Sequence, residues 1–283
     1  MAKLLKGKPV ADAILADVRG RADALRGRGV VPTLAVVRVG EEPGDLAYER
    51  TLLKKAAEAG VETRTVSLDA TVGQEVLEFV LRQVGEDPAI HGCLLFLPLP
   101  ARLDGATACE TVDPRKDVDG ITRASLATVF CGEGVGFAPS TAEACIHVLD
   151  FYGIPLEGRR VTVVGRSLVV GRPLAQLLLA RNATVTMCHS RTVDLAGECC
   201  RADIVISAMG RARALDADSF RPGQTVLDVG INFDDQGRMC GDVDAAAADS
   251  IVEALTPVPG GIGSVTCAVT LDHAVTAAER LLL

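Results

Sequence analysis

Apolar runs alternate with amphipathic stretches along the first half of the chain. The runs that are short and apolar enough to be buried strands are residues 33–39, 61–67 and 90–97. Residues 45–59 and 74–84 instead repeat apolar positions at helical spacing, and Gly60 is a typical stop after the first of these helices. Strands that alternate with helices in this way predict a parallel α/β fold.

The second half repeats this pattern and adds a helix at its end. Strands are expected at residues 160–164, 184–188, 203–207 and 225–229. Helices are expected at residues 172–181 and 140–152, where Ser140 and Glu143 have capping-box spacing. The final amphipathic stretch, residues 265–282, has the pattern of a helix that packs back on the first half.

A segment rich in glycine, residues 132–140 (GEGVGFAPS), separates the two halves and is typical of a domain boundary. We therefore expect an α/β protein of two domains. One is residues 1–139, completed by a C-terminal helix over residues 265–283, and the other is residues 140–264. Ligands of open parallel sheets bind at the carboxyl ends of the strands, so the loops after the strands are the expected sites.

Composition narrows the possible partners. The 283 residues carry 29 Lys and Arg against 37 Asp and Glu, a net charge of −8 that argues against binding of nucleic acid or anionic membranes. Aromatic residues make up only 3% and Trp is absent, so surfaces that stack on single strands or sugars are scarce. Ligands must then be bound mainly by backbone groups, charges and aliphatic side chains.

The nine cysteines form no Cys-x-x-Cys pair and no cluster with His at zinc-binding spacing. Reduced thiols in a cytoplasmic protein fit this pattern better than a disulfide framework, and no metal site is expected. The chain has no signal-peptide apolar region and no run of 18 apolar residues, so we expect a cytoplasmic protein that does not span a membrane.

A candidate cofactor site lies in the second half. Residues 161–173 (VTVVGRSLVVGRP) combine a buried strand, a glycine turn and Pro173 near the start of a helix. Such a turn brings backbone amides and a helix N-terminus to the pyrophosphate of a dinucleotide. Gly165 and Gly171 do not have Gly-x-Gly-x-x-Gly spacing, so an ordinary strand-turn-helix remains the alternative interpretation of this stretch.

The end of the next strand indicates which dinucleotide would bind. A free ribose 2′-hydroxyl is usually bound by Asp or Glu, and a 2′-phosphate by cationic and hydroxyl groups. Residues 188–192 are Cys-His-Ser-Arg-Thr, and no acid follows before Asp194. Ser190 and Arg191, joined by Arg166 from the glycine turn, therefore favour NADP, unless Arg191 is only a solvated surface charge.

Seven motifs are spread over both halves. They are residues 97–100 (LPLP), 116–120 (KDVDG), 165–173 (GRSLVVGRP), 183–192 (ATVTMCHSRT), 227–232 (LDVGIN), 241–244 (GDVD) and 256–266 (TPVPGGIGSVT). In order and spacing they resemble the bifunctional methylenetetrahydrofolate dehydrogenase/methenyltetrahydrofolate cyclohydrolase family. The resemblance spans nearly the whole chain, and several motifs in one order are more specific than any single motif.

The resemblance implies a homodimer with a folate-binding domain and an NADP-binding Rossmann domain on either side of a cleft. It implies cofactor contacts from Gly165, Arg166, Ser167, Ser190 and Ile231. The glycine turn adds Gly171 to these candidates, and the end of the next strand adds Arg191. The resemblance also implies substrate contacts from Tyr48, Leu95, Phe96, Leu97, Asp119, Pro259, Gly260, Gly261, Ile262, Gly263 and Thr266. Asp119 would accept hydrogen bonds from the pterin ring, unless it serves only as a turn residue.

Several active-site positions depart from the family pattern. The family usually carries Ser-x-x-Tyr-x-x-x-Lys on the helix after the first strand, and this chain keeps Tyr48 but has Asp45 at the serine position and Leu52 at the position of the catalytic lysine. Phe96 stands where the family has Gln before Leu-Pro-Leu. Hydride transfer needs orientation above all, whereas hydrolysis of a methenyl cation needs protons moved, a task for lysine.

We therefore expect an NADP-dependent dehydrogenase that oxidises methylenetetrahydrofolate, with cyclohydrolase activity weak or lost. Two alternatives stay open: a family paralogue that acts on a different imine-like substrate in specialised metabolism, and an NADP-binding pseudoenzyme. A fully bifunctional enzyme would require Lys55, which at 100° per residue projects about 60° from Leu52. Our preferred interpretation is that Lys54 and Lys55 both lie on a solvated helix face.

Overall fold

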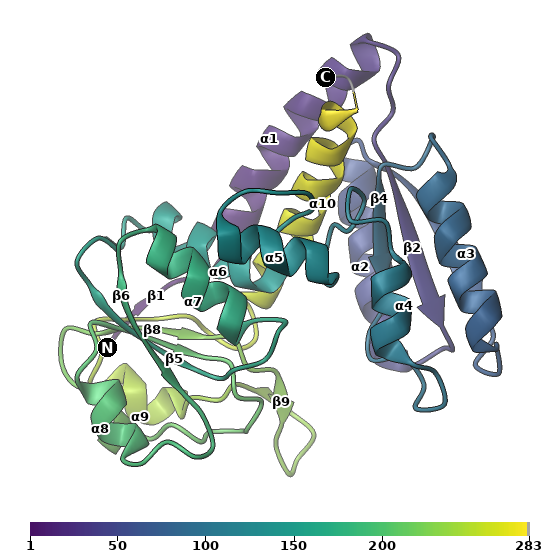
Figure 1. Ribbon diagram of the computed structural model, residues 1–283. Coiled ribbons are helices and arrows are strands. Elements are labelled where there is room, and N and C mark those ends of the chain that lie inside the picture. The colour runs from purple at the N-terminus through teal and green to yellow at the C-terminus, as the bar shows by residue number, and fades with distance from the viewer. Residues whose placement is uncertain (282–283) are drawn as a thin grey trace. The chain divides into compact units, whose positions relative to one another are not determined.

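The computed structural model describes residues 1–281, which form two compact units (Figure 1). The large-sheet unit comprises Met1–Ala11 and Thr141–Thr266, and the small-sheet unit comprises Asp12–Ser140 and the chain from Cys267 onward. Helices α1 (Gly7–Gly27) and α10 (Gly263–Arg280) each begin in the large-sheet unit and continue into the small-sheet unit. The expected C-terminal helix is α10, and its last two expected residues, 282–283, lie outside the described residues.

Six parallel strands form the sheet of the large-sheet unit, in the order β1-β11-β8-β7-β5-β6. In that order they are Lys3–Leu4, Ala254–Leu255, Thr225–Asp228, Ile204–Ser207, Arg160–Val164 and Thr184–Cys188. Because β1 pairs with β11, the first eleven residues group with this unit, whereas the sequence led us to expect them with residues 12–139. The carboxyl ends of the parallel strands lie at one edge of the sheet.

Helices cover both faces of this sheet (Figure 1). Helices α6 (Ser140–Phe151) and α7 (Gly171–Ala180) lie on one face, and α8 (Leu195–Cys200) and α9 (Ala245–Asp249) lie on the other. The single-turn helix η1 (Ala217–Ser219) and the antiparallel strands β9 (Asn232–Phe233) and β10 (Met239–Cys240) complete the unit. The inner strands β5, β7 and β8 are buried, as their apolar runs in the sequence predicted, whereas the edge strand β6 is mostly exposed.

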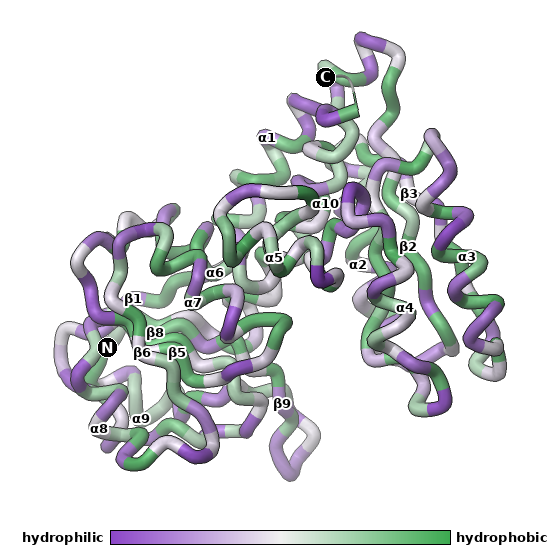
Figure 2. The backbone as a smooth tube through the Cα atoms, viewed as in Figure 1, coloured by the Kyte–Doolittle hydropathy of each residue, from purple (hydrophilic) through white to green (hydrophobic). Residues whose placement is uncertain are grey.

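The small-sheet unit has three parallel strands in the order β3-β2-β4. They are Glu62–Leu68, Thr33–Val39 and Gly92–Leu95 in that order. Its other helices are α2 (Pro43–Glu58), α3 (Gln74–Glu86), α4 (Gly105–Thr111) and α5 (Arg123–Cys131). Figure 2 shows the central strand β2 as a hydrophobic stretch, while α3 alternates hydrophobic and hydrophilic positions.

Alternate residues of β2 face opposite layers of this unit. Leu34 and Val36 pack in one core with residues of α1, α2 and α10, and Ala35, Val37 and Val39 pack in another with residues of α3 and α4. Helix α2, which carries three of the predicted site residues (Tyr48, Leu52 and Lys55), is therefore fixed on one face of the sheet by buried side chains. The α/β class and the two-domain organisation predicted from the sequence are confirmed.

All nine cysteines are unpaired, and six of them are buried. Among residues 1–281, no group of three or more His, Cys, Asp or Glu side chains is arranged to hold a metal ion. No helix in the described part of the chain is both long and apolar enough to cross a membrane.

Candidate active site

The turn after β5 can be built only from glycine at two positions. Gly165 has a φ of 135°, and a β-carbon there would overlap the carbonyl oxygen of Ala208. A β-carbon on Gly171, the first residue of α7, would overlap the carbonyl oxygen of Gly165. The chain therefore passes close to its own backbone at the start of α7. Such a close approach of strand and helix, made possible by glycine, is typical of a dinucleotide-binding turn.

Hydrogen bonds hold the residues between these two glycines. The Ser167 Oγ accepts from the backbone N–H of Val170 at 3.1 Å, and the Ser167 carbonyl accepts from the backbone N–H of Arg172 at 3.1 Å. The Arg172 Nε donates to the carbonyl of Arg166 at 3.0 Å. With its backbone fixed in this way, the turn presents the exposed side chain of Arg166.

A second turn follows the neighbouring strand β6. The Thr192 Oγ1 accepts from the backbone N–H of His189 at 2.8 Å, and the backbone N–H of Thr192 donates to the His189 carbonyl at 2.8 Å. Val164 at the end of β5 pairs with Cys188 at the end of β6, so the two turns leave the sheet at the same edge. Ser190 and Arg191 lie on this second turn.

The charges at this edge suit a phosphate. Neither the Arg166 nor the Arg191 side chain has a hydrogen bond or ion pair among the described residues, so both guanidinium groups can take an anion. The turn after β6 contains no carboxylate. Residues of this kind fit a ribose 2′-phosphate better than a free 2′-hydroxyl.

Two buried carboxylates fix the loops after β7 and β8, a role that sequence reasoning missed. Asp228 accepts from the backbone N–H groups of Gly230, Asp242 and Val243 at 2.9 to 3.1 Å. Asp242 accepts from the Ser207 Oγ at 3.0 Å and from the backbone N–H groups of Met209, Gly210 and Arg211. Burial raises the pKa of Asp228 to about 6, and its backbone hydrogen bonds oppose the rise.

These carboxylates also account for the exposure of Ile231. The Asn232 Nδ2 donates to the Asp242 Oδ1 at 3.0 Å, and Gly230 and Gly241 have no room for a β-carbon because Asp242 and Asp228 lie against them. Ile231, between two residues held in this way, is 59% exposed. The LDVGIN and GDVD motifs thus act together to present one apolar side chain.

The PGGIG segment lies in the same unit, against the start of α1. The backbone N–H of Gly7 donates to the Gly260 carbonyl at 2.8 Å, and neither Gly7 nor Gly261 has room for a β-carbon. Pro259, Gly260 and Gly263 are exposed, Thr266 is half-buried, and Ile262 is buried.

In the small-sheet unit, Tyr48 and Phe96 form an aromatic pair. Their ring centroids lie 5.6 Å apart with the planes tilted by 55°. Tyr48 comes from α2 and forms a hydrogen bond with Thr270 of α10, and burial raises the pKa of its phenol. Leu52, one turn further along α2, is fully buried in the core that contains Phe96. The position of the family's lysine is thus occupied by an apolar side chain packed among others.

Asp119 lies in the segment that runs beside β4. It accepts a hydrogen bond from the hydroxyl of Ser140, the first residue of α6, so this hydroxyl serves Asp119 where the sequence suggested a helix cap. Burial and the nearby charge of Asp117 raise the pKa of Asp119 to about 6, against the opposing effects of Ser140 and His273. The neighbouring Asp117 is occupied differently, because it accepts from the backbone N–H groups of Ile121 and Thr122.

The two lysines of α2, Lys54 and Lys55, differ in their exposure and in the groups near them. Lys54 is exposed and forms an ion pair with Glu58, as expected for a solvated helix face. Lys55 is half-buried. Burial raises the pKa of the Cys267 thiol, and the charge of Lys55 opposes this rise. Cys267 in turn contributes to the raised pKa of the Tyr48 phenol. Lys55 therefore lies toward α10 and the Tyr48 side of the helix, unlike the solvated position we expected.

The two leucines on either side of Phe96 have different surroundings. Leu95 points to the opposite face of the small sheet and packs in the core of α3 and α4. Leu97 is 39% exposed. In the small-sheet unit, the structure thus brings together Tyr48, Phe96 and Leu52 and leaves the Leu95 side chain elsewhere.

A parallel sheet with a glycine turn at a helix start, and a basic turn on the next strand, defines the large-sheet unit as a dinucleotide-binding domain. Comparison with protein families agrees: residues 139–282 match the NAD(P)-binding domain, and residues 5–119 the catalytic domain, of tetrahydrofolate dehydrogenase/cyclohydrolase. The chain belongs to this family.

Individual relatives extend over the full chain. The bifunctional protein FolD of Carboxydothermus hydrogenoformans is 46% identical over 283 residues, covering 99% of each chain. Among solved structures, the bifunctional FolD of Campylobacter jejuni has a TM-score of 0.96 at 33% identity and covers 99% of this chain and 100% of its own. FolD of Trypanosoma brucei, solved with NADP and an inhibitor, has a TM-score of 0.93 at 32% identity and covers 99% and 98%.

Proposed function

We propose that this protein is an NADP-dependent dehydrogenase that oxidises methylenetetrahydrofolate to methenyltetrahydrofolate, and that its cyclohydrolase activity is weak or lost. Membership of the family supports the first part, and the FolD of Campylobacter jejuni is named as a methylenetetrahydrofolate dehydrogenase/cyclohydrolase. The second part rests on this chain's own residues. We also propose that the protein acts as a homodimer, as the family resemblance implies, and that it is cytoplasmic, as the cysteine pattern and the lack of a signal-peptide region led us to expect.

The large-sheet unit fits NADP at several points. The glycine turn has no room for side chains at Gly165 and Gly171, which lets a pyrophosphate approach the backbone and the N-terminus of α7. Arg166, Ser190 and Arg191 would bind the 2′-phosphate, since the two guanidinium groups have no other partner among the described residues. NADP, when bound, supplies the hydride acceptor.

The small-sheet unit supplies groups that bind and orient a pterin. The Tyr48 ring, held by Phe96 and Thr270, offers a fixed aromatic face for stacking. Asp119 offers a carboxylate that accepts hydrogen bonds, and Ser140 fixes its orientation. Orientation of this kind is the main requirement for hydride transfer, and it needs no acid or base of the protein.

The burial of Leu52 is the observation that carries the proposal of weak hydrolysis. The side chain is fully buried in an apolar core, with Phe96 in the same core, and neither can hold or move a proton. Hydrolysis of the methenyl cation requires that water be activated, for which a positioned acid–base group typically contributes about 10²–10⁴-fold. A site without that group can still orient the substrate for hydride transfer, but it loses this contribution to the rate of hydrolysis.

Two assays on one preparation test the proposal. NADP-dependent formation of methenyltetrahydrofolate should be robust, while hydrolysis of added methenyltetrahydrofolate should exceed the spontaneous rate only slightly. A bifunctional FolD assayed beside it provides the reference ratio. Hydrolysis at that reference ratio would refute the loss of cyclohydrolase activity, and absence of methenyl formation would refute the dehydrogenase assignment.

A second candidate, full bifunctional activity, is favoured by one observation, the position of Lys55 toward Cys267 and α10. If Lys55 replaces the missing lysine, Lys55→Ala should abolish hydrolysis and leave methenyl formation nearly unchanged. Lys54→Ala is the matched control, because Lys54 is exposed on the same helix. Hydrolysis that is equally low in wild type and both variants would exclude this candidate.

A further inference from the structure

A cavity of about 810 Å³ lies in the small-sheet unit, away from Tyr48 and Phe96. This volume is typical of small-molecule sites. His91, which lines the cavity, comes just before β4, whereas Phe96 comes just after it. Five residues of extended chain separate the two positions by about 16 Å. The cavity is therefore at the opposite end of the strand from the candidate active site.

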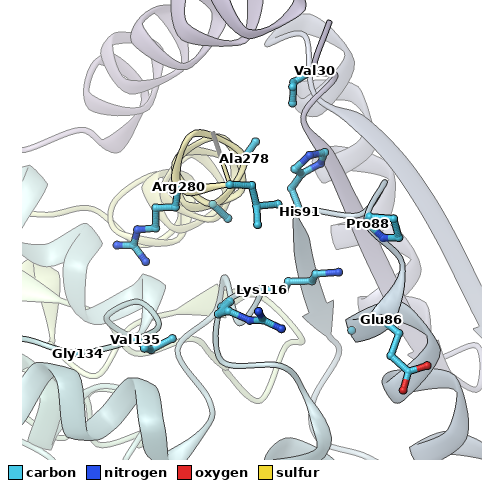
Figure 3. Close-up of a pocket in the computed structure, with 13 residues that line it drawn as sticks. Val30, Glu86, Pro88, His91, Lys116, Gly134, Val135, Ala278 and Arg280 are labelled. Carbon is cyan, nitrogen blue, oxygen red and sulfur yellow. The ribbon is translucent and has the colours of Figure 1, made fainter. Parts of the chain in front are cut away.

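The lining is basic, although the protein is acidic. Arg115, Lys116 and Arg280 line the cavity together with His91, and Glu86 is the one acid among the lining residues described (Figure 3). The whole chain has a net charge of −8, so this positive surface is local. Although Glu86 lies in the lining and Arg115 is paired with Asp113, cations outnumber acids among the lining residues, and a concave surface with an excess of one charge concentrates small ions of the opposite charge.

His91 supplies a buried donor of fixed orientation. His91 is 6% exposed. Its Nδ1 accepts a hydrogen bond from the backbone N–H of Thr33 at 3.2 Å. Because Nδ1 is an acceptor, the proton of the neutral ring is on Nε2. Within the described chain, every fully buried side-chain nitrogen or oxygen has a hydrogen-bond partner, and the bond at Nδ1 is the one that His91 makes. Nε2 is therefore not fully buried, and His91 is among the residues that line the cavity.

Two cations beside it are held in place. Lys116, 7% exposed, donates from Nζ to the carbonyl of Val84 at 3.1 Å and to that of Asp87 at 2.7 Å, which leaves its third proton available. Arg115 is fixed by Asp113 through Nε at 3.1 Å and Nη2 at 2.6 Å. Both charges are thus oriented without a ligand, which reduces the entropy lost on binding.

Apolar residues complete the lining. Val30, Pro88, Val135, Ala277 and Ala278 all contribute to the cavity. A hydrated inorganic ion gains nothing from such a surface, whereas the alkyl part of an organic acid buries apolar area against it.

We propose that this cavity is a second ligand site, which binds a small aliphatic carboxylate. The carboxylate accepts from the His91 Nε2 and lies beside Arg115 and Lys116, and the alkyl chain packs on Pro88 and Ala278. A purely structural role is the rival explanation for the cations, because Lys116 also caps the carbonyls at the end of α3. The rival predicts no binding of any anion.

Hexanoate is a suitable probe, with hexanol as its neutral counterpart and inorganic phosphate as an anion without an alkyl chain. The protein has four histidines, so the imidazole nitrogens of His91 can be followed by NMR during titration. Hexanoate should shift the Nε2 signal saturably, with half-saturation at about 1 mM or below. Hexanol and phosphate should each shift it far less at equal concentration.

Three variants locate the site. Arg115→Gln should weaken hexanoate at least threefold, while Arg82→Gln, an equal change of charge at an exposed arginine of α3 outside the cavity, should not. His91→Asn keeps an acceptor for the Thr33 N–H, removes the Nε2 donor, and should weaken hexanoate tenfold when followed by calorimetry. Absence of saturable binding, equal binding of hexanol or phosphate, or equal effects of Arg115→Gln and Arg82→Gln would overturn the proposal.

Discussion

The turn after β5 and the helix after β2 occupy comparable places in their units, because each follows a central parallel strand. They are constrained in different ways. At the first, backbone atoms leave no room for any side chain at Gly165 or Gly171. At the second, Leu52 is held by side-chain packing in a core that also contains Phe96, the residue after β4. A site made of backbone admits one residue type, whereas a site made of side chains can change its chemistry while the fold is kept.

The largest effect expected from this comparison is at the glycine turn. Gly165→Ala forces a β-carbon into the Ala208 carbonyl at a φ of 135°, so we expect destabilisation by about 3 kcal/mol or more and loss of NADP binding. Urea unfolding and NADP titration by calorimetry would measure both. Gly20→Ala on α1 is the control, because its β-carbon meets no atom within 4 Å, and it should stabilise by up to about 1 kcal/mol. Equal behaviour of the two variants would refute the role given to the turn.

Elements of the fold differed in how well the sequence predicted them. The strands at residues 160–164 and 184–188 were predicted with their observed bounds, because each is a short apolar run next to a turn signal. Helix α1 was missed although Val10, Ile14 and Val18 recur at helical spacing. Strand β1 has two residues, too few for any pattern, and only its pairing with β11 defines it.

Site residues could be predicted where they belong to one contiguous motif, but not where their roles depend on residues far away in the sequence. The glycine turn is a contiguous motif, so its position followed from the sequence. The hydrogen bonds of Asp228 to Asp242 and Val243 join residues 14 and 15 positions apart, and nothing in the sequence indicates that pairing. The direction of Lys55 was also unpredictable, because it depends on α10, more than 200 residues further along the chain.

The next largest effect is expected at Leu52, in the region held by side-chain packing. Leu52→Lys buries an ammonium group in an apolar core, so we expect destabilisation by about 3 kcal/mol, against less than about 1.5 kcal/mol for Leu52→Met. If the site lost hydrolysis through this position, Leu52→Lys combined with Phe96→Gln should raise the hydrolysis rate about tenfold or more. Denaturant unfolding and the methenyl hydrolysis assay measure the two effects. A double variant with unchanged hydrolysis would mean that other residues also limit this activity.

Two carboxylates with raised pKa values, the half-buried Asp119 of the small-sheet unit and the buried Asp228 of the large-sheet unit, allow a smaller effect to be compared. Burial raises the pKa values of Asp119 and Asp228 to about 6, above those of the unfolded chain. The folded state therefore binds more protons between about pH 4 and 6, and the free energy of unfolding should rise as the pH falls through this window. Asp119→Asn should reduce that rise without abolishing it, because Asp228 remains.

Activity should respond to Asp119 in the opposite direction. The ionised carboxylate is the better hydrogen-bond acceptor for a pterin, so the KM for methylenetetrahydrofolate should increase below pH 6. Urea unfolding at pH 5 and 7.5, with KM measured at the same two values, tests both statements. A KM that is independent of pH would remove Asp119 from the substrate site.

The smallest effect concerns the choice between dinucleotides. Arg191 has no partner among the described residues, so its loss should cost the protein little stability, within about 0.5 kcal/mol. Binding of a 2′-phosphate should suffer instead: Arg191→Gln should raise the KM for NADP about tenfold, the effect of roughly 1.4 kcal/mol. NAD lacks that phosphate and should be unaffected.

Arg201→Gln is the matched control for this change, because Arg201 is also an exposed arginine of the large-sheet unit but is paired with Glu198. It should leave the KM for NADP unchanged, since an exposed ion pair contributes less than about 1 kcal/mol to stability and this one is not on the turn after β6. Equal losses for NADP and NAD in Arg191→Gln would place this residue outside the 2′-phosphate site. A selective loss for NADP would instead show that side chains around a turn fixed by its backbone can still determine which cofactor is bound.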